Sequence, residues 1–477
     1  MTYRDFDNYL PITIILFRSY REFYLHSSIT DKEAVTVVAT PKYRRVLKAL
    51  LNLRAFEALR NREYRLLLNG QVFASMGQWM DEVTRGWLIY ELTNSALQLG
   101  LVRGIQVIPY LLLSPVAGSA ADRFSRKTQV VVAQFLNGLV YIATALLIFT
   151  GRIRPWHVYV TAFIMAITQV FQQPARAAMV SDVVPSAYLT NAIGLNAMVN
   201  NMSRSIGPAL AGMLIAMVGT GGTYSVQAVF YFLATVWTVQ LRSAQRPSAT
   251  GTAFSPAAGT DLAGTGTDSK PVPAPCRESF GQSIIEGWKF SWRNLAVRAG
   301  LLTVMFVELF IVPFTTLLPV FARDLLAVGS AGQGFLLTAM GIGALCSAVL
   351  IASAGERLPR GIIMLGSVLI YGLVIVIFAA SSWFQLSLVM MVLAGLCHVH
   401  SHALVQTVIQ SYSPSDYCGR TMALFNMSKV LMIAGSMLIG TLSTLLGARW
   451  AVASMGAAGV LTMVIMLAAM PQARHIR

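Results

Sequence analysis

Two apolar stretches of the chain are joined by the run Gly118-Ser119-Ala120-Ala121-Asp122-Arg123-Phe124-Ser125-Arg126-Lys127. A partly altered copy, Glu356-Arg357-Leu358-Pro359-Arg360, joins two apolar stretches in the second half of the chain. A short polar loop between long hydrophobic segments is typical of a turn between two membrane-spanning helices. Its repetition predicts that the chain consists of two related halves, each with the same hairpin.

The composition is that of a membrane protein. Of 477 residues, 55% are hydrophobic and only 12% are charged, whereas soluble domains carry about 25% charged residues. The net charge of +16 would suggest nucleic acid as a partner for a soluble protein. Here most Lys and Arg lie between apolar segments or near the N-terminus, where insertion topology and anionic lipid account for them. We therefore expect no nucleic-acid binding.

Twelve apolar stretches are long enough to cross a membrane as helices, which predicts an all-α membrane protein. They fall into two sets of six, separated by a linker rich in Ala, Gly, Ser, Thr and Pro. The stretches lie near 66–91, 95–118, 127–150, 156–180, 188–218, 222–241, 297–321, 331–354, 361–380, 384–409, 418–446 and 449–470. The predicted parts are an N-terminal extension (1–62), a six-helix bundle (63–242), a linker with a surface helix (243–295), a second six-helix bundle (296–470) and a tail (471–477).

The distribution of positive charge predicts the orientation. With both termini in the cytoplasm, the cytoplasmic side receives the loop at Arg123, Arg126 and Lys127, the central linker and the tail. The outer loops then receive only a few basic residues, namely Arg152, Arg154, Arg323 and Arg449. Cytoplasmic loops of membrane proteins are enriched in Lys and Arg. We therefore expect a multi-pass protein of the cytoplasmic (inner) membrane with both termini in the cytoplasm.

A second repeat supports the two-half organisation. Asn201-Met202-Ser203-Arg204 in the fifth stretch is echoed by Asn426-Met427-Ser428-Lys429 in the eleventh, in the order that two parallel six-helix halves require. Together with the loop at Gly118, these features resemble the major facilitator superfamily. Pro174-Ala175-Arg176, Asn191-Ala192 and the run from Arg204 to Gly212 are similar to its branch of enterobactin exporters and macrolide efflux pumps.

The resemblance implies a conformational role for the repeated loop. In the family this loop is a latch that favours the outward-facing state, and its matching residues here are Gly118, Asp122, Arg123, Arg126, Lys127, Glu356, Arg357 and Arg360. Asp122 is suited to pair with Arg126 or to accept hydrogen bonds from a facing helix N-terminus. The second copy has Glu356 for Asp122 and Gly361 for Lys127, so we expect it to latch less strongly. Positive-inside charge alone explains the basic residues but not Asp122.

Small residues recur every four positions on two stretches: Ser203, Gly207 and Ala211 on the fifth, and Ala339, Gly343 and Ser347 on the eighth. Such stripes permit close helix contact in lipid. The resemblance implies that these two helices meet between the halves. Gly207-Pro208, with Gly212 one turn on, also resembles the family's antiporter motif, where proline favours a bend.

Ionisable and polar groups at membrane depth are the candidate site residues. An ionisable group there costs about 2.5–3.5 kcal/mol to insert and so indicates a pathway or a partner. The resemblance implies that the first, fourth, seventh and tenth helices line a central cavity, and those helices carry most of these groups. The candidates for the cavity and for proton coupling are Gln78, Asp81, Glu82, Arg85, Gln169, Gln172, Gln173, Arg176, Arg204, Glu308, His398, His402, Gln406 and Lys429.

Several of these residues have alternative interpretations. Glu82 and Arg85 could be only a structural pair. His398 and His402 have the spacing of a metal pair, but no third ligand lies nearby in the sequence, so we expect no metal. Arg204 and Lys429, at matching positions of the repeat, could attract an anionic substrate or bond to helix carbonyls. Asp81, Glu82 and Glu308 are left as candidate proton carriers.

The function expected from these features is secondary active export of a small siderophore-like or drug-like molecule, driven by protons, by a monomer without cofactors. No nucleotide-binding motif is present, which argues against an ATP-driven pump, and no cluster of catalytic groups suggests an enzyme. A lipid or lysolipid flippase of the same fold, a membrane sensor, and uptake instead of export are the alternatives.

Overall fold

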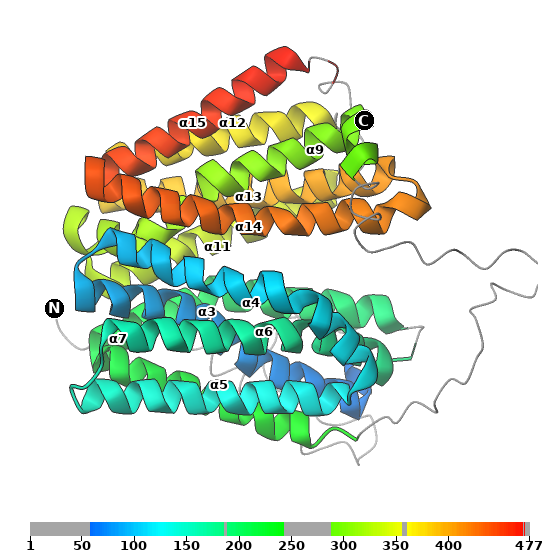
Figure 1. Cartoon of the computed structure of the whole chain (residues 1–477), viewed down its shortest axis with the longest axis vertical. Coiled ribbons are helices and arrows are strands. Elements are labelled where there is room, and N and C mark those ends of the chain that lie inside the picture. The colour runs from blue at the N-terminus through cyan, green and yellow to red at the C-terminus, as the bar shows by residue number, and fades with distance from the viewer. Residues whose placement is uncertain (1–57, 186–187, 243–287, 355–359, 471, 473–477) are drawn as a thin grey trace, which may run out of the picture. The chain divides into compact units, whose positions relative to one another are not determined.

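The first half of the chain folds into long helices joined by short turns (Figure 1). The computed structural model describes residues 58–185, 188–242, 288–354, 360–470 and 472. The chain divides into Met1–Arg54 and Ala55–Arg477, and all that follows concerns the second unit. Its first five helices are α3 (Arg62–Thr93), α4 (Ala96–Arg123), α5 (Arg126–Phe149), α6 (Pro155–Val183) and α7 (Leu189–Val239).

The second half of this unit is also helical. One segmented helix is followed by five regular ones, so the described residues are all-α, as predicted. The segmented helix consists of α9 (Leu295–Phe306), η3 (Val307–Ile311), η4 (Val312–Leu317), α10 (Leu318–Val320) and η5 (Phe321–Leu325). The regular helices are α11 (Gly329–Ala354), α12 (Arg360–Ala380), α13 (Phe384–Tyr412), α14 (Ser415–Leu446) and α15 (Ala448–Ala469).

Polar residues at the turns begin and end several helices. Asn61 accepts a hydrogen bond from the backbone N–H of Glu63, and Asn294 does the same for Ala296 and Val297, which satisfies amides that have no partner within the helix. Asn94 ends α3 in the left-handed conformation with φ 50°. These caps fix where successive helices reverse direction.

The predicted fifth and sixth stretches form one long run, α7, that is interrupted at Gly219. This glycine has φ 73° and ψ 177°, a backbone conformation that residues with a side chain rarely adopt. The interruption lies between the two predicted stretches, which ended at 218 and began at 222. α7 therefore reverses direction at Gly219 without a conventional loop.

The predicted seventh stretch, 297–321, is not a regular helix. Two π-helical segments, η3 and η5, flank a 3-10 segment, η4, and a single turn, α10. Pro313 and Pro319 lie within this part, and proline removes a backbone hydrogen bond and clashes with the preceding turn. Irregular segments inside helices are frequent at functional sites.

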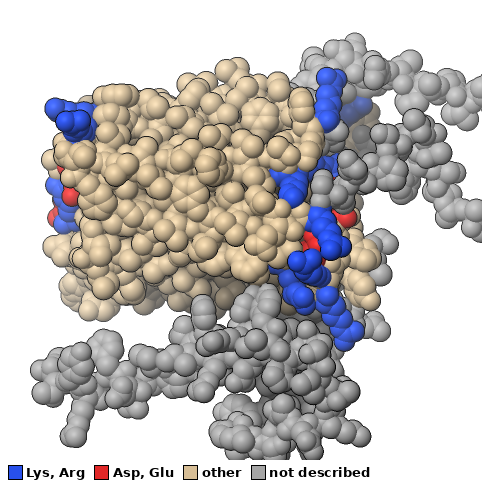
Figure 2. All heavy atoms as spheres, turned by 90° about the horizontal axis from the view of Figure 1, so that it is seen from below, with Lys and Arg blue, Asp and Glu red and all other residues tan. Residues whose placement is uncertain are grey.

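The surface identifies a multi-pass membrane protein. Nine helices within the described ranges are long and apolar enough to cross a membrane. The polar helices α3 and α6 are not among them. Apolar side chains such as Phe135 and Leu146 on α5 and Ile370 and Leu373 on α12 are exposed, which would be unfavourable in contact with water. Figure 2 shows Lys and Arg gathered at two ends with an uncharged band between them, as expected of a protein embedded in lipid.

For orientation, the end of the unit at the α4–α5 turn is here called the Phe124 end, and the end at the α3–α4 turn is called the Asn94 end. Helices α3 to α7 pack mainly on one another, and so do α9 to α15. The two sets meet where α4 packs on α14 and α7 packs on α11. A Cβ on Gly100 would lie 2.5 Å from the carbonyl oxygen of Ser436, and one on Gly212 would lie 2.5 Å from that of Ser330. Close contact of the halves at the Asn94 end thus depends on these glycines.

The two predicted stripes of small residues do not face each other. A Cβ on Gly207 would lie 2.8 Å from Cβ of Trp79 in α3, and Gly343 packs against the backbone of α13 near Val392, so each stripe packs within its own half. The contact between α7 and α11 instead involves Ser205 against Gly341. The two helices therefore meet between the halves, as the resemblance implied, but through residues outside the two stripes.

Candidate functional site

A pocket that is partly open to solvent lies between α3 and α4 of the first half and η4, α10 and α11 of the second. Its charged lining comes from Asp81, Glu82, Arg85 and Arg103, two carboxylates and two guanidinium groups. Thr315 and Gln333 add polar groups from the second half. Because both halves line it, a relative movement of the halves would change its shape.

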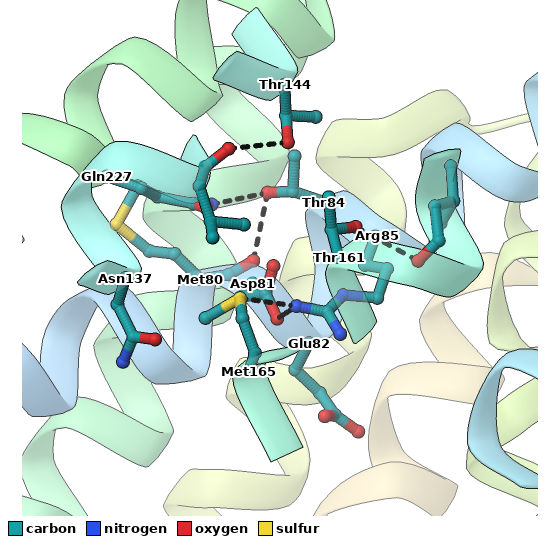
Figure 3. Close-up of polar contacts among 12 residues, drawn as sticks. Met80, Asp81, Glu82, Thr84, Arg85, Asn137, Thr144, Thr161, Met165 and Gln227 are labelled. Atoms are coloured by element: carbon teal, nitrogen blue, oxygen red, sulfur yellow. Dashed lines mark hydrogen bonds and ion pairs between the residues drawn. The ribbon is translucent and has the colours of Figure 1, made fainter. Parts of the chain in front are cut away.

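Arg85 is held by a buried ion pair within α3. Its Nη2 lies 2.5 Å from Oδ2 of Asp81, four residues earlier, and 2.8 Å from the sulfur of Met165 in α6. Figure 3 shows one guanidinium nitrogen of Arg85 facing both Asp81 and Met165, while Glu82 points away. Above this pair in the view of Figure 3, Gln227 of α7 donates a hydrogen bond of 2.8 Å to Thr84. Breaking a buried pair of this kind leaves an uncompensated charge, so the pair fixes Arg85 in place.

Glu82 pairs with Arg103 of α4, not with Arg85. Arg103 Nη1 donates to Oε2 at 2.8 Å, and Nη2 donates to Oε1, which makes the interaction bidentate. The Glu82–Arg85 pair that the sequence left as an alternative is therefore wrong, because the guanidinium of Arg85 is already paired with the carboxylate of Asp81. Arg103 was not among the predicted site residues, although a basic residue within an apolar stretch was a signal that could have found it.

The other predicted polar residues divide into buried and exposed groups. On α6, Gln169 and Gln172 are buried, whereas Gln173 is exposed. Gln78 on α3 and Arg176 on α6 are half-buried. Gln406 on α13 and Lys429 on α14 are exposed. The three exposed residues lie in the parts of their helices toward the Phe124 end.

Glu308 and His402 form a second polar centre, away from the pocket. Oε1 of Glu308 lies 2.9 Å from Nε2 of His402, and Glu308 is only 4% exposed. The ring of His398 lies 4.9 Å from that of His402. The structure thus brings together three residues predicted separately on the seventh and tenth helices. No group of three metal-binding side chains occurs in the part of the chain that the structure describes.

Arg204 lies between the halves. Its guanidinium stacks over the ring of Trp79 at 5.3 Å, and Trp79 donates a hydrogen bond of 3.2 Å to Asn200. Its charge is within electrostatic range of both Glu82 and Glu308. A cation on an aromatic face keeps its charge available to other groups, unlike one held in a bidentate ion pair.

The Asn94 end is closed by contacts between α3 and η5 that sequence reasoning missed. The hydroxyl of Tyr90 donates to Asp324, and Arg323 donates to the side-chain oxygen of Asn94. The guanidinium of Arg323 also lies 4.8 Å from the centre of the Tyr90 ring. In the sequence, Arg323 and Asp324 resemble ordinary loop charges, and no pattern links them to α3.

The loop at Gly118 makes a polar network around the start of α5. Nη1 of Arg126 lies 2.8 and 2.7 Å from the two carboxylate oxygens of Asp182 at the end of α6, and Lys127 donates to the carbonyl of Leu241. Arg123 is exposed. Asp182 is a partner that the sequence did not indicate. Five of the predicted latch residues cannot be placed in this network. The surroundings of Gly118, Asp122 and Arg360 lie outside the described positions, and so do the whole residues Glu356 and Arg357.

A membrane-embedded helical unit with a charged pocket between its halves is the architecture of a small-molecule transporter. The chain belongs to the major facilitator family described as transmembrane secretion effectors, whose pattern matches residues 53–253 and 265–475. The resemblance predicted from the repeated loop is thereby confirmed.

Relatives in this family include both drug and siderophore transporters. An uncharacterised MFS-type transporter of Bacillus subtilis is 28% identical over 74% of this chain and 80% of its own length. The multidrug efflux pump Tap of Mycobacterium tuberculosis is 25% identical over the same shares. A staphyloferrin A transporter of Staphylococcus aureus is 28% identical over 33% of this chain and 40% of its own.

Solved structures show the same fold. A bacterial homologue of the human lysosomal transporter Spinster, in an inward-facing and unoccupied conformation, matches with a TM-score of 0.63 and 14% identity over 87% of this chain and 95% of its own. The nucleoside transporter NupG matches with a TM-score of 0.63 and 13% identity over 85% of this chain and 98% of its own.

Proposed function

We propose that this protein exports a small molecule across the cytoplasmic membrane by alternating access, in exchange for protons. The observation that carries the proposal is the charged pocket at the junction of the halves, where Glu82 and Asp81 face groups from η4 and α11. Buried ionisable groups are costly in a membrane protein and mark solute or proton pathways. The efflux pumps among the relatives favour export over uptake.

The topology proposed is that of twelve helices in two six-helix bundles, with both termini in the cytoplasm. α7 supplies two of the twelve by reversing at Gly219, and α9 to η5 supply one. The Phe124 end carries more basic residues than the Asn94 end, which supports a cytoplasmic position for the Phe124 end. We further propose that a single chain is sufficient, because the pocket is lined from within it.

The conformation described here is proposed to be inward-facing. At the Asn94 end the halves touch through Gly100, Gly212 and the contacts of Tyr90 with Asp324. Toward the Phe124 end, Gln406 and Lys429 are exposed. The pair of Arg126 and Asp182 joins α5 to α6 within the first half, so it is compatible with this inward-facing state.

The substrate class proposed is polar or amphipathic. The pocket combines charged side chains with the apolar Ile89, Leu99 and Leu337, a lining suited to a molecule with both characters. A second candidate, a lysolipid flippase, is favoured by the apolar side chains of α4 near the Phe124 end, since Leu112 is 69% and Val116 is 52% exposed. An exposed apolar helix face would admit an acyl chain.

The test is transport by the purified full chain in proteoliposomes with an imposed pH gradient. The probes are a macrolide, the lipophilic cation ethidium, a carboxylate siderophore and a fluorescent lysolipid. Export predicts that at least one of the three solutes accumulates and that a protonophore abolishes the accumulation. Movement of the lysolipid alone would support the flippase, and solute movement that ignores the gradient would refute proton exchange.

A further inference from the structure

Four titratable side chains lie together where η3, α12 and α13 meet. Beyond the contact of Glu308 with His402, the ring of His398 lies 5.9 Å from the ring of Tyr371 on α12, so the cluster is continuous. Tyr371 is fully buried. Phe425 of α14 covers the other side of His402, with ring centres 5.7 Å apart. The cluster is therefore enclosed by protein on several sides.

This cluster has polar atoms without partners. Oε2 of Glu308, Nδ1 of His398 and the hydroxyl of Tyr371 are buried, and each lacks a hydrogen bond among the described residues. A buried polar atom without a partner costs about 1–3 kcal/mol, so such atoms are retained where they serve a ligand, a water molecule or a proton. Three of them in one cluster indicate a site and not a packing fault.

The charged surroundings suit a proton better than a metal ion. The guanidinium of Arg204 on α7 is within electrostatic range of Glu308, His398 and Tyr371. The thiol of Cys397 on α13 is within the same range of Tyr371. α14, which also packs on η3, carries Lys429, whose side chain is exposed. A nearby arginine disfavours a further cation, whereas a carboxylate and an imidazole both exchange protons.

The other two candidate carboxylates are less suited to exchange protons. Asp81 also has an oxygen without a partner, but Arg85 binds its second oxygen, and Arg103 binds both oxygens of Glu82. A guanidinium does not lose its charge in proteins, so protonating Asp81 would leave the buried Arg85 uncompensated, and protonating Glu82 would disrupt its bidentate pair with Arg103. Glu308, in contrast, has a partner on only one of its oxygens, and that partner is an imidazole.

The backbone at Glu308 is also unusual. Glu308 lies in the π-helical segment η3, directly before Pro313 breaks the helix, and α14 approaches this segment so closely that a Cβ on Gly435 would contact the proline ring. In secondary transporters, coupling ions bind at discontinuous helices. This observation is independent of the side-chain contacts.

We propose that Glu308, positioned by His402, is the group that binds and releases the transported proton. Without the proton, the carboxylate of Glu308 accepts a hydrogen bond from Nε2–H of neutral His402. A proton from water then binds Oε2 and forms the neutral acid, and release to water on the other side restores the carboxylate. The inference rests on the proposed proton exchange and assigns its site.

Infrared difference spectroscopy of the purified full chain, between acidic and alkaline pH, tests the site without transport. Beside the bands of the exposed carboxyl groups, the wild type is expected to show a separate carboxylic acid band that Glu308→Gln removes and that the exposed control Glu91→Gln retains. His402→Gln is expected to shift the pH at which the band appears. A band that persists in Glu308→Gln would overturn the proposal.

Transport provides the second measurement. Glu308→Gln is expected to lower proton-driven accumulation of ethidium, or of whichever probe the wild type moves, by about tenfold or more, equivalent to about 1.4 kcal/mol. Glu91→Gln should remain near wild type. Undiminished accumulation in Glu308→Gln would refute the assignment. If the wild type moves no solute but shows the Glu308 band, the export proposal fails and the proton site stands.

Discussion

The closure of the Asn94 end by close backbone contact predicts the effect of one methyl group at Gly100. A Cβ at this position would lie 2.5 Å from the carbonyl oxygen of Ser436 and 3.1 Å from Cα of Met437. Both atoms belong to backbone, which cannot rotate away as a flexible side chain can. Gly100→Ala therefore disfavours the described conformation relative to one in which α4 and α14 separate.

Overpacking of this kind costs about 1–3 kcal/mol. An energy difference of that size changes a two-state equilibrium about 5- to 150-fold. Gly194→Ala is the matched control, because it is a helical glycine with nothing within 4 Å of its added Cβ. Both substitutions improve helix propensity by about 1 kcal/mol in either conformation, so that gain does not shift the equilibrium.

Distances between spin labels measure the shift. Cysteines replacing the exposed Arg152 and Leu445, in a chain whose native cysteines are substituted, report on the separation of the halves at the Asn94 end. Gly100→Ala is expected to add a longer distance that Gly194→Ala does not. Identical distributions in the two variants would show that the contact at Ser436 does not hold this end closed.

Two further predictions concern polar contacts. Tyr90→Phe removes the hydroxyl that donates to Asp324, and we expect it to destabilise the closed conformation of the Asn94 end by about 1–3 kcal/mol. The measurement is a larger share of the long spin-label distance, and an unchanged share would contradict this. Arg103→Leu leaves Glu82 without its partner. Because both side chains are partly exposed, we expect it to destabilise the protein by only about 1–3 kcal/mol in thermal unfolding. Glu82→Leu in the same chain should restore part of the loss, and an additive double variant would exclude the pair.

Much of the helical layout follows from local sequence features. The predicted stretches correspond to helices of the structure because twenty apolar residues between polar turns have few alternatives in a membrane. The interruption of α7 at Gly219 was foreseeable, since the gap between the two apolar stretches contains only glycine and threonine. The break at η4 was also foreseeable, because Pro313 and Pro319 lie within a stretch taken as regular.

Partners between distant helices were not predictable in the same way. Arg103 reaches Glu82 across a turn of the chain, and Asp324 reaches Tyr90 between the halves. Helical spacing relates residues on one face of one helix, and it carries no information about which face a neighbour presents. For the same reason, the sequence did not indicate that Gly207 packs on Trp79 of α3.

One irregular segment links the two polar centres to the closed end. Glu308 lies in η3, Thr315 of η4 lines the pocket with the paired carboxylates, and Asp324 of η5 holds Tyr90 at the Asn94 end. A straight helix would transmit a change at one point only by moving as a rod. A segment broken at Pro313 can rearrange locally, because its backbone hydrogen bonds are already interrupted there. If Glu308 binds the proton as proposed, this segment provides a route from that residue to the pocket and to the closing contacts, as the proposed exchange of solute for proton requires.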